Sequence, residues 1–287
     1  MKDNKKHKKA EYGILITGLI ILLAVACIIA LCAGQYSVSV PEVTKILASR
    51  FVNVTKTWSN TAEGVVFTLR LPRIIGAVLV GSALSLSGAA YQGVFKNPLV
   101  APDLLGVSSG ACVGASVAIL LHLNSFGVQA MAFVAGILAV GLTLFIPRLI
   151  KNTNMTMLVL SGIIVKGIMD SVMGIIKYVA DPETELQSIT YWQLGSLTKV
   201  LPKDLFTVGP VIVAASVIIF LLRWRINILS LGDREAKTLG VSVTVVRNFI
   251  IICATLLTAS AVCISGTIGW IGLVIPHFAR MLTGPDN

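Results

Sequence analysis

The sequence has few charged residues for its length. Lys, Arg, Asp and Glu make up 13% of its 287 residues, against roughly 25% in soluble domains. Hydrophobic residues make up 55%, and the mean hydropathy is +0.88. This composition excludes an ordinary soluble domain and indicates an integral membrane protein.

Patterns for metal, phosphate and nucleic-acid binding are also missing. The five cysteines lie within or at the ends of apolar runs without metal-type spacing, and they are Cys27, Cys32, Cys112, Cys253 and Cys263. No GxxxxGK[ST] phosphate loop occurs. The net charge of +10 comes from basic residues scattered through short connections. We therefore expect this chain to bind no metal, no cofactor and no nucleic acid.

Long apolar runs fill most of the sequence. A run of about 18 or more residues is long enough to cross a hydrocarbon core roughly 30 Å thick as a helix. The sequence predicts an all-α polytopic membrane protein with about eight crossings, near residues 13–33, 74–94, 104–122, 128–147, 156–179, 206–223, 247–264 and 267–283. The first run is too long for a cleaved signal peptide, so we expect a retained anchor.

Basic residues predict the orientation of these spans. Residues 1–12 form a basic tail that should stay in the cytoplasm, because Lys and Arg near span ends favour that side. Alternation then places the basic connection 224–246 inside and the loop 34–73 outside. Arg70 and Arg73 belong to this outer loop and run against the trend.

The outer loop is predicted to contain a short helix. Ser39-Val40-Pro41-Glu42 resembles a capping box that opens a helix. Val43, Ile46 and Leu47 would then share one face of it. We expect this helix to lie along the outer membrane surface.

The chain is predicted to break after the second span. Asn97-Pro98 and Ala101-Pro102 prevent a continuous helix, because proline lacks an N–H donor and disfavours helix at the residue before it. Asp103 could cap the next helix. Glycines at four-residue spacing, Gly106, Gly110 and Gly114, allow close helix approach in lipid.

The fifth span carries two charges in its middle, Lys166 and Asp170. A charge at that depth costs roughly 2.5–3.5 kcal/mol on insertion scales, so each should face the bundle or a wet cavity. At i, i+4 they can pair with each other. Two interpretations stay open: a self-neutralised pair between helices, or the polar lining of a substrate path.

The connection 224–246 contains a predicted helix of about two turns. Gly232 and Gly240 bracket it, and apolar Leu231, Ala236 and Leu239 alternate with charged residues such as Asp233. A helix this short is marginal alone in water, so it must pack on its own bundle or on a partner. It is either a solvated connector or a docking surface.

The last segment, "SGTIGWIGLVIPHFARMLTGPDN", mixes glycines with Pro276, His277 and Arg280. A lone histidine near a span end is more typical of a packing residue than of a ligand. No second histidine lies nearby in the sequence, so a metal site is unsupported.

Five motifs in order resemble those of the FecCD-type permease family, the membrane subunits of type II ABC importers for iron-siderophores, haem and vitamin B12. They are "LRLPR", "GSALSLSGAAYQGVFKNPLVAPDLLGVSSGA", "YWQLGSL", "LGDREAKTLGV" and "GTIGWIGLVIPHFARML". The resemblance covers nearly the whole chain. It implies a single permease domain over residues 1–287 in a bacterial cytoplasmic membrane. It also implies a second permease copy, two ABC ATPase subunits that hydrolyse ATP, and an extracytoplasmic substrate-binding protein as partners.

The resemblance also implies roles for matched residues. Arg70 and Arg73 match outer arginines that meet the binding protein. The family's ATPase-coupling loop is matched here by Leu231, Gly232, Asp233, Ala236, Leu239 and Gly240. The family's pathway-lining helix and the inner gate before it are matched by the fifth span, at Thr156, Ser161, Lys166 and Asp170. The remaining motif positions are structural and comprise Asn97, Pro98, Pro102, Gly106, Gly272, Pro276, His277 and Arg280.

The sequence departs from the family pattern in two ways. Family members have about ten spans and the last two are absent here, so we expect either a fragment or a truncated gene product. Lys166 and Asp170 are also more polar than the family leads us to expect. The leading hypothesis is a transport subunit without catalysis of its own, carrying a ferric siderophore or related iron, haem or corrinoid chelate. The alternative is an ion-coupled secondary transporter that uses the Lys166/Asp170 pair.

Overall fold

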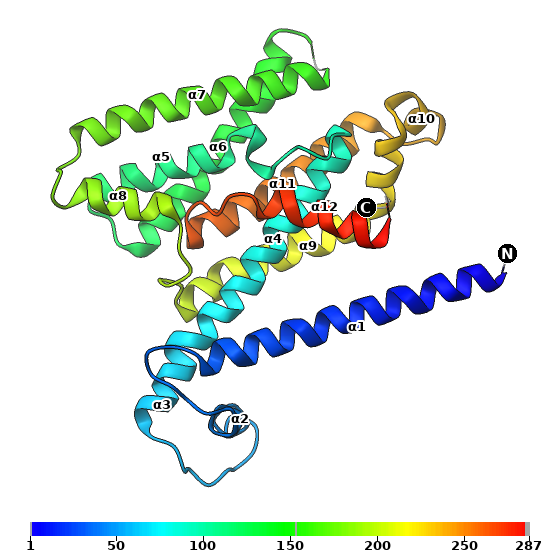
Figure 1. Ribbon diagram of the computed structural model, residues 1–287. Helices are drawn as coiled ribbons and strands as arrows, with labels where there is room; N and C mark the ends of the chain where they lie inside the picture. Colours follow the sequence, from blue (N-terminus) through cyan, green and yellow to red (C-terminus); the bar gives the residue numbers. More distant parts are fainter. Residues whose placement is uncertain (1, 153, 285–287) are drawn as a thin grey trace. The chain divides into compact units, whose positions relative to one another are not determined.

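The computed structural model describes residues 2–152 and 154–284, with side chains from residue 12 onward. The predicted basic tail therefore lies largely outside the described side chains. The described part is helical, in agreement with the predicted all-α class (Figure 1). Its contacts divide it into two compact units, residues 1–77 and 78–287. Each is described here by itself, and the single permease domain stays a prediction.

The first unit is built around a small apolar cluster. Its elements are α1 (Lys2–Cys32), α2 (Val40–Ala48), α3 (Asn60–Gly64), the π-helical turn η1 (Val65–Arg70) and the start of α4 (Leu71–Phe95). The predicted outer helix exists as α2, and Val43 and Ile46 are buried on its inner face. Ser39 occupies the N-cap position without a side-chain hydrogen bond, so the predicted capping box does not form. Apolar burial on one face thus stabilises α2 without the cap.

The second predicted span begins earlier than expected. The sequence suggests that its helix starts just after Pro72, whereas helical structure runs from Asn60 to Phe95. Proline cannot donate the hydrogen bond of an α-helix interior. The turn before it is π-helical, with the Leu71 N–H bonded to the Val66 carbonyl, and this wider turn accommodates the proline within a continuous helix.

The chain breaks after α4 as predicted. Lys96 has a left-handed backbone (φ 53°). Asn97 Oδ1 then accepts the Leu99 N–H at 2.9 Å. A short 3₁₀ turn, η2 (Pro102–Leu105), and Gly106 with φ 81° lead into α5 (Val107–Leu120). This turn re-enters the bundle instead of continuing α4.

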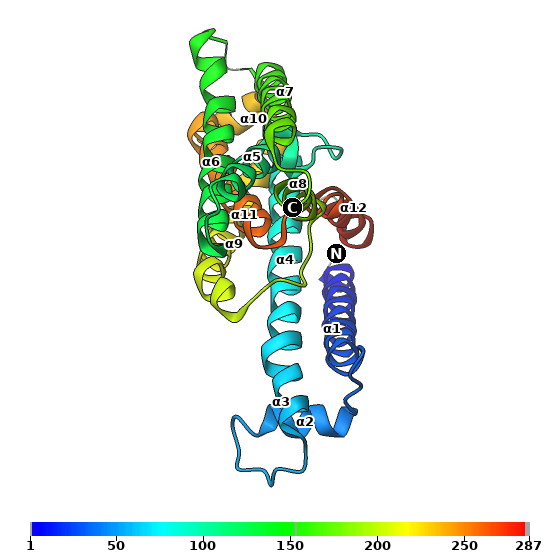
Figure 2. The ribbon, with the colours of Figure 1, turned by 90° about the vertical axis from the view of Figure 1, so that its left-hand side faces the viewer.

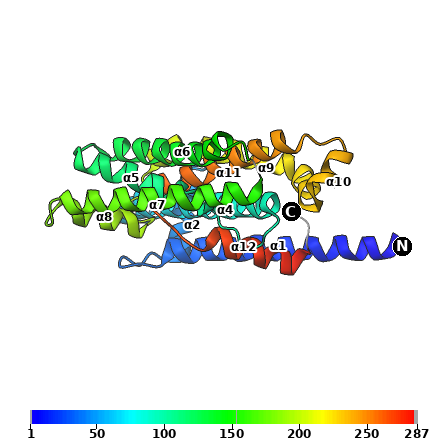
Figure 3. The same cartoon turned by 90° about the horizontal axis from the view of Figure 1, so that it is seen from above.

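Among its described residues, the second unit has seven further helices, and α11 packs against α5, α6 and α9. The seven are α6 (Ser125–Leu149), α7 (Met155–Val179), α8 (Glu185–Leu194), α9 (Pro202–Leu231), α10 (Asp233–Thr238), α11 (Val243–Ser265) and α12 (Ile271–Thr283). Figures 2 and 3 show α11 beside α6 and α9. Its apolar window is 78% buried, against 28% for α7, which identifies α11 as the core helix of this unit.

Small residues bring α5 and α6 into close contact. A Cβ at Gly110 would lie 2.5 Å from the Ala139 Cβ, and one at Gly114 would lie 2.3 Å from the Met131 carbonyl oxygen. Neither position has room for a side chain. The predicted role of these two glycines in close helix approach is confirmed.

Six of the eight predicted crossings are helices long and apolar enough to span a membrane. The other two are shorter, because α5 has 14 residues and α12 has 13. At 1.5 Å per residue, α5 is about 21 Å long. The η2 turn takes up the predicted start of α5, and a non-helical segment at 266–270 precedes α12.

Candidate functional site

The η2 turn is held between α6 and α7 by close contacts. A Cβ at Gly162 of α7 would lie 2.3 Å from the Leu104 carbonyl oxygen, so only glycine allows the turn to approach so closely. From the other side, the buried Thr143 hydroxyl donates to the Leu105 carbonyl at 3.0 Å. These contacts fix the position of the neighbouring Asp103.

Asp103 joins two elements through its carboxylate. Oδ1 accepts the Ser108 N–H at 3.2 Å in the first turn of α5, which confirms the predicted cap. Oδ2 lies 3.6 Å from Nζ of Lys166 on α7. A carboxylate at a helix N-terminus is favourable, because it satisfies a free N–H and complements the helix dipole.

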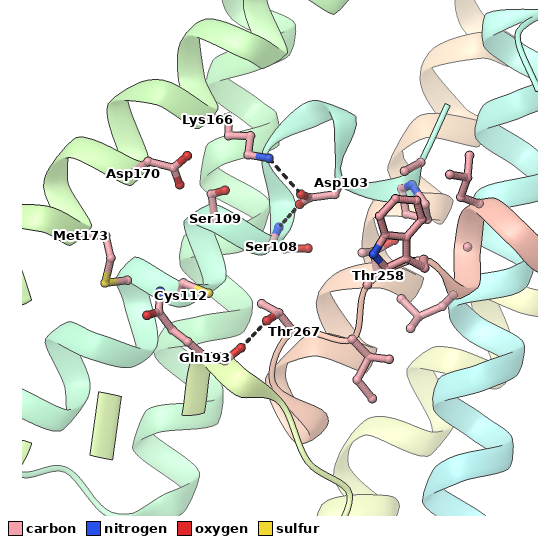
Figure 4. Close-up of a pocket in the computed structure, with 18 residues that line it drawn as sticks. Asp103, Ser108, Ser109, Cys112, Lys166, Asp170, Met173, Gln193, Thr258 and Thr267 are labelled. Atoms are coloured by element: carbon pink, nitrogen blue, oxygen red, sulfur yellow. Dashed lines mark hydrogen bonds and ion pairs between the residues drawn. The ribbon is translucent and has the colours of Figure 1, made fainter. Parts of the chain in front are cut away.

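A cavity of about 250 Å³ with a mixed polar and apolar lining lies beside this carboxylate (Figure 4). Its wall combines charged, hydroxyl and apolar side chains from α4, α5, α7, α8, α11 and α12. The lining residues are Leu84, Ala101, Pro102, Asp103, Ser108, Ser109, Cys112, Lys166, Asp170, Met173, Gln193, Thr258, Thr267, Ile268, Gly269, Trp270, Gly272 and Leu273. The wall includes two carboxylates, Asp103 and Asp170, and one ammonium group, Lys166.

The predicted pair between Lys166 and Asp170 is not among the ion pairs of the described residues. Lys166 pairs instead with Asp103 on the η2 turn. Both α7 residues line the cavity, and Figure 4 shows Asp170 farther along the same helix. The self-neutralised pair is therefore wrong, because the packing of the turn on α7 supplies another carboxylate. The polar-lining interpretation agrees with the cavity.

The start of α12 closes another part of the cavity wall. A Cβ at Gly272 would lie 2.4 Å from Pro102 Cγ, so this glycine permits the contact between α12 and the η2 turn. Pro276 is buried within α12. The predicted structural roles of Gly272, Pro102 and Pro276 agree with this packing. His277 is exposed, and its predicted structural role stays a prediction.

Gln92 is a buried residue that the sequence analysis did not single out. Its Nε2 donates to the carbonyls of Val100 and Leu273, each at 3.2 Å, and its Oε1 accepts from Arg280. It thereby ties the loop after α4 to α12. A glutamine inside the apolar run "GAAYQGVF" was the available signal, because a buried amide needs partners.

Trp270 is the second residue that the sequence analysis missed. Its side chain is 78% exposed and lines the cavity, and its backbone is left-handed (φ 68°). Non-glycine residues in this conformation are uncommon. No local sequence pattern predicts the conformation.

Two of the predicted gate residues lie away from the cavity. Ser161 is buried, and its hydroxyl donates to the Met157 carbonyl of the same helix at 2.8 Å. Thr156 is exposed in the first turn of α7. Neither lines the cavity formed by Lys166 and Asp170. Of the four residues predicted to form the pathway and its gate, Lys166 and Asp170 line the cavity, whereas Thr156 and Ser161 do not.

Helix α10 matches the predicted helix between Gly232 and Gly240. Both glycines have positive φ, 148° and 77°, and end the helical turns on either side. Ala236 is fully buried, whereas Leu231 and Leu239 are 67% and 60% exposed. The expected apolar face thus reduces to one alanine, and the two leucines are free to contact another surface.

Arg70 and Arg73 have different surroundings within the first unit. The Arg70 guanidinium donates to the carbonyls of Leu31, at 2.6 Å, and Cys32, at 3.2 Å, at the end of α1, and also to the Tyr36 carbonyl. A cation there complements the helix dipole. Arg70 therefore has a structural role, and its predicted docking role stays a prediction.

No cluster of three or more His, Cys, Asp or Glu side chains that could hold a metal ion occurs among the described residues. The cavity wall contains three residues of these types: Asp103 on the η2 turn, Cys112 on α5 and Asp170 on α7.

Comparisons with known proteins agree with this architecture. The model of the FecCD transport family matches residues 22–287. The molybdate import system permease protein MolB of Haemophilus influenzae is 36% identical, over 96% of this chain and 82% of its own length. The hemin transport system permease protein HmuU of Yersinia pestis is 37% identical, over 76% and 67%. A solved transporter assigned to the metal-chelate ABC type, in an inward-facing conformation, superposes with a TM-score of 0.84 at 34% identity, covering 96% of this chain and 83% of its own.

Proposed function

The chain belongs to the FecCD transport family, and we propose that it is the permease subunit of an ATP-binding-cassette importer for metal chelates. The observation that carries this proposal is the family match over residues 22–287, together with six candidate membrane spans among the described residues. Relatives named for import of molybdate and of hemin support a role in uptake.

The proposed cargo is a ferric siderophore or a related iron, haem or corrinoid chelate. It would cross the cytoplasmic membrane of a bacterium along a path that includes the cavity beside Asp103. The cavity holds two carboxylates and one ammonium group, which suits passing contact with a polar chelate. Lys166 and Asp103 are 49% and 39% exposed, so solvent screens their attraction and the pair can open during transport.

The proposed importer needs partners for every other task. ATP would be bound and hydrolysed by two separate ATPase subunits that dock around α10, where Leu231 and Leu239 are exposed. A second permease copy would complete the pathway. An extracytoplasmic binding protein would deliver cargo to the region of residues 34–73. The permease chain itself would catalyse no reaction and bind no cofactor.

The ion-coupled alternative has lost its main structural argument. It depended on a Lys166/Asp170 pair, and Lys166 is paired with Asp103 instead. Asp170 is an exposed carboxylate in the cavity and remains the residue that a proton-coupled mechanism would use.

Energy coupling of uptake tests the proposal directly. Proteoliposomes would hold this chain, its partner ATPase and a binding protein, with radiolabelled ferric hydroxamate, hemin, cobalamin and molybdate as separate probes. We expect uptake of one probe to persist when a protonophore collapses the gradient. Uptake should stop when the phosphate-loop lysine of the ATPase is replaced. Uptake that depends on the gradient and survives the inactive ATPase would reject the importer.

A further inference from the structure

Three charged residues from distant parts of the second unit meet at one end of α10. Lys96 directly follows α4, Asp233 is the first residue of α10, and Arg247 lies in the second turn of α11. Lys96 Nζ is 2.9 Å from Asp233 Oδ1. Arg247 Nη2 is 2.8 Å from Oδ1 and 2.9 Å from Oδ2. One carboxylate therefore accepts hydrogen bonds from two cations on two different elements.

The arginine contact is the more firmly held of the two. The Arg247 side chain is only 14% exposed, whereas Lys96 is 34% and Asp233 48% exposed. Hydrogen bonds between charged groups are stronger than neutral ones, and partial burial reduces their screening by salt. The Arg247 hydrogen bond, with a smaller effect from Lys96, holds the pKa of Asp233 below its usual range.

Helix α10 has few other attachments to its unit. It is six residues long, and Ala236 is its buried residue. Gly232 and Gly240 on either side have positive φ values, which glycine adopts without steric strain. A helix of this length does not hold its orientation without tertiary contacts. Its orientation therefore depends on Ala236 and on the carboxylate of Asp233.

The two helices joined by Asp233, α4 and α11, both reach the cavity beside Asp103. Leu84 of α4 and Thr258 of α11 are part of its wall. The loop after Lys96 continues into the η2 turn, which carries Asp103. A displacement of α10 transmitted through Asp233 would therefore act on two separate parts of the cavity wall.

We propose that Asp233 is a positioning residue that ties α10 to the end of α4 and the start of α11, so that the three elements move together. The role of this tie in transport rests on the proposed function, in which an ATPase docks around α10. The tie itself depends only on contacts within this chain.

Mobility of α10 tests the tie without any partner. A spin label would be attached at Lys237→Cys, on the exposed side of α10, in a cysteine-free form of the full chain. Asp233→Asn should increase the mobile fraction of the label roughly tenfold, because it removes the charge from both hydrogen bonds. Arg247→Gln combined with Asp233→Asn should add little to either single change. The matched control is Asp181→Asn, since Asp181 is an exposed aspartate whose carboxylate accepts hydrogen bonds from the nearby Glu183 and Thr184. An unchanged label in Asp233→Asn would overturn the tie.

The response of the cavity to ATP tests the role in transport. A label at Trp270→Cys would report on the cavity in the assembled importer, before and after addition of MgATP. We expect Asp233→Asn to reduce the MgATP response at least about fivefold while the ATPase still copurifies, because charge-assisted contacts of this kind are lost. An undiminished response would reject the coupling role. If the ATPase no longer copurifies, the label at position 237 in the free chain decides: a mobile label supports the tie and an immobile label overturns it.

The two experiments separate failure of the tie from failure of the proposed function. The importer assignment fails if the chain without Asp233→Asn assembles with no ATPase. It also fails if the label at position 270 does not respond to MgATP in that chain. The mobility of the label at position 237 then still decides whether Asp233 holds α10 in place.

Discussion

Arg70 and Arg73 are three residues apart, but only the Arg70 guanidinium forms hydrogen bonds within the described part of the chain. Its guanidinium satisfies carbonyls at the end of α1, where the last four carbonyl groups of a helix lack intrahelical partners. Arg73 is half-buried, and its guanidinium has no hydrogen bond or ion pair with the described residues. The proposed docking to a binding protein therefore rests mainly on Arg73.

Separate substitutions distinguish the two arginines. Arg73→Glu should weaken association with the binding protein by about tenfold or more, because it reverses a charge that would face carboxylates. Arg70→Gln should lower the melting temperature, because the hydrogen bonds from the guanidinium to the end of α1 are lost. It should change association by less than about twofold. Association measured by biolayer interferometry and melting measured in detergent decide between them. Equal association for Arg73→Glu and the unmodified chain would contradict the docking role.

Close packing of the η2 turn on α7 brings two charged residues of the cavity wall together. Gly162 permits it, and the resulting approach brings Asp103 within 3.6 Å of Lys166. A larger residue at position 162 must push against a backbone carbonyl. A carbonyl in a turn held from both sides cannot yield as a flexible side chain would.

Alanine at two glycines of α7 tests this packing. Gly162→Ala should lower the melting temperature by roughly 5 °C, through the clash with the Leu104 carbonyl. Gly167→Ala is the matched control, because nothing lies within 4 Å of a Cβ at that position. There the melting temperature should stay level or rise slightly, since alanine favours helix over glycine. Similar losses for both variants would mean that the effect comes from helix propensity instead of packing.

Helix positions were largely predictable, but helix lengths were not. Apolar runs locate a span because burial in lipid requires them along the whole segment. The start of α5 depends on the η2 turn, whose position is fixed by Thr143 on α6 and Gly162 on α7. The continuous helix through Pro72 depends on a π-helical turn that no residue pattern marks. Such boundaries follow from neighbours distant in sequence.

At the scale of the whole molecule, the orientation predicted from charge remains to be measured. The prediction puts the N-terminus and the connection 224–246 in the cytoplasm and the loop before α9 outside. Lys199 and Lys237 are exposed residues of these two connections. The prediction places these two positions on opposite sides of the membrane.

Cysteine labelling in intact cells tests this orientation. In a cysteine-free background, a membrane-impermeant maleimide should label Lys199→Cys strongly and leave Lys237→Cys unlabelled until the cells are opened. The lipid barrier is the physical reason, since the reagent cannot cross the hydrocarbon core. Opening the cells is the control for reactivity at position 237. The reverse labelling pattern would overturn the orientation and place Arg70 inside.

The all-α membrane class, the approximate spans, the break after α4 and the bounds of α10 could all be predicted from the sequence. These features follow from local patterns: apolar run length, proline, and glycines that end a helix. The partner of Lys166, the network of Gln92 and the meeting of Lys96 and Arg247 at Asp233 became visible only in the packed helices. Gln92 and Leu273 are 181 residues apart, and Lys96 and Asp233 are 137 apart. Contacts over such separations depend on how the helices pack, which the period of a single segment does not encode.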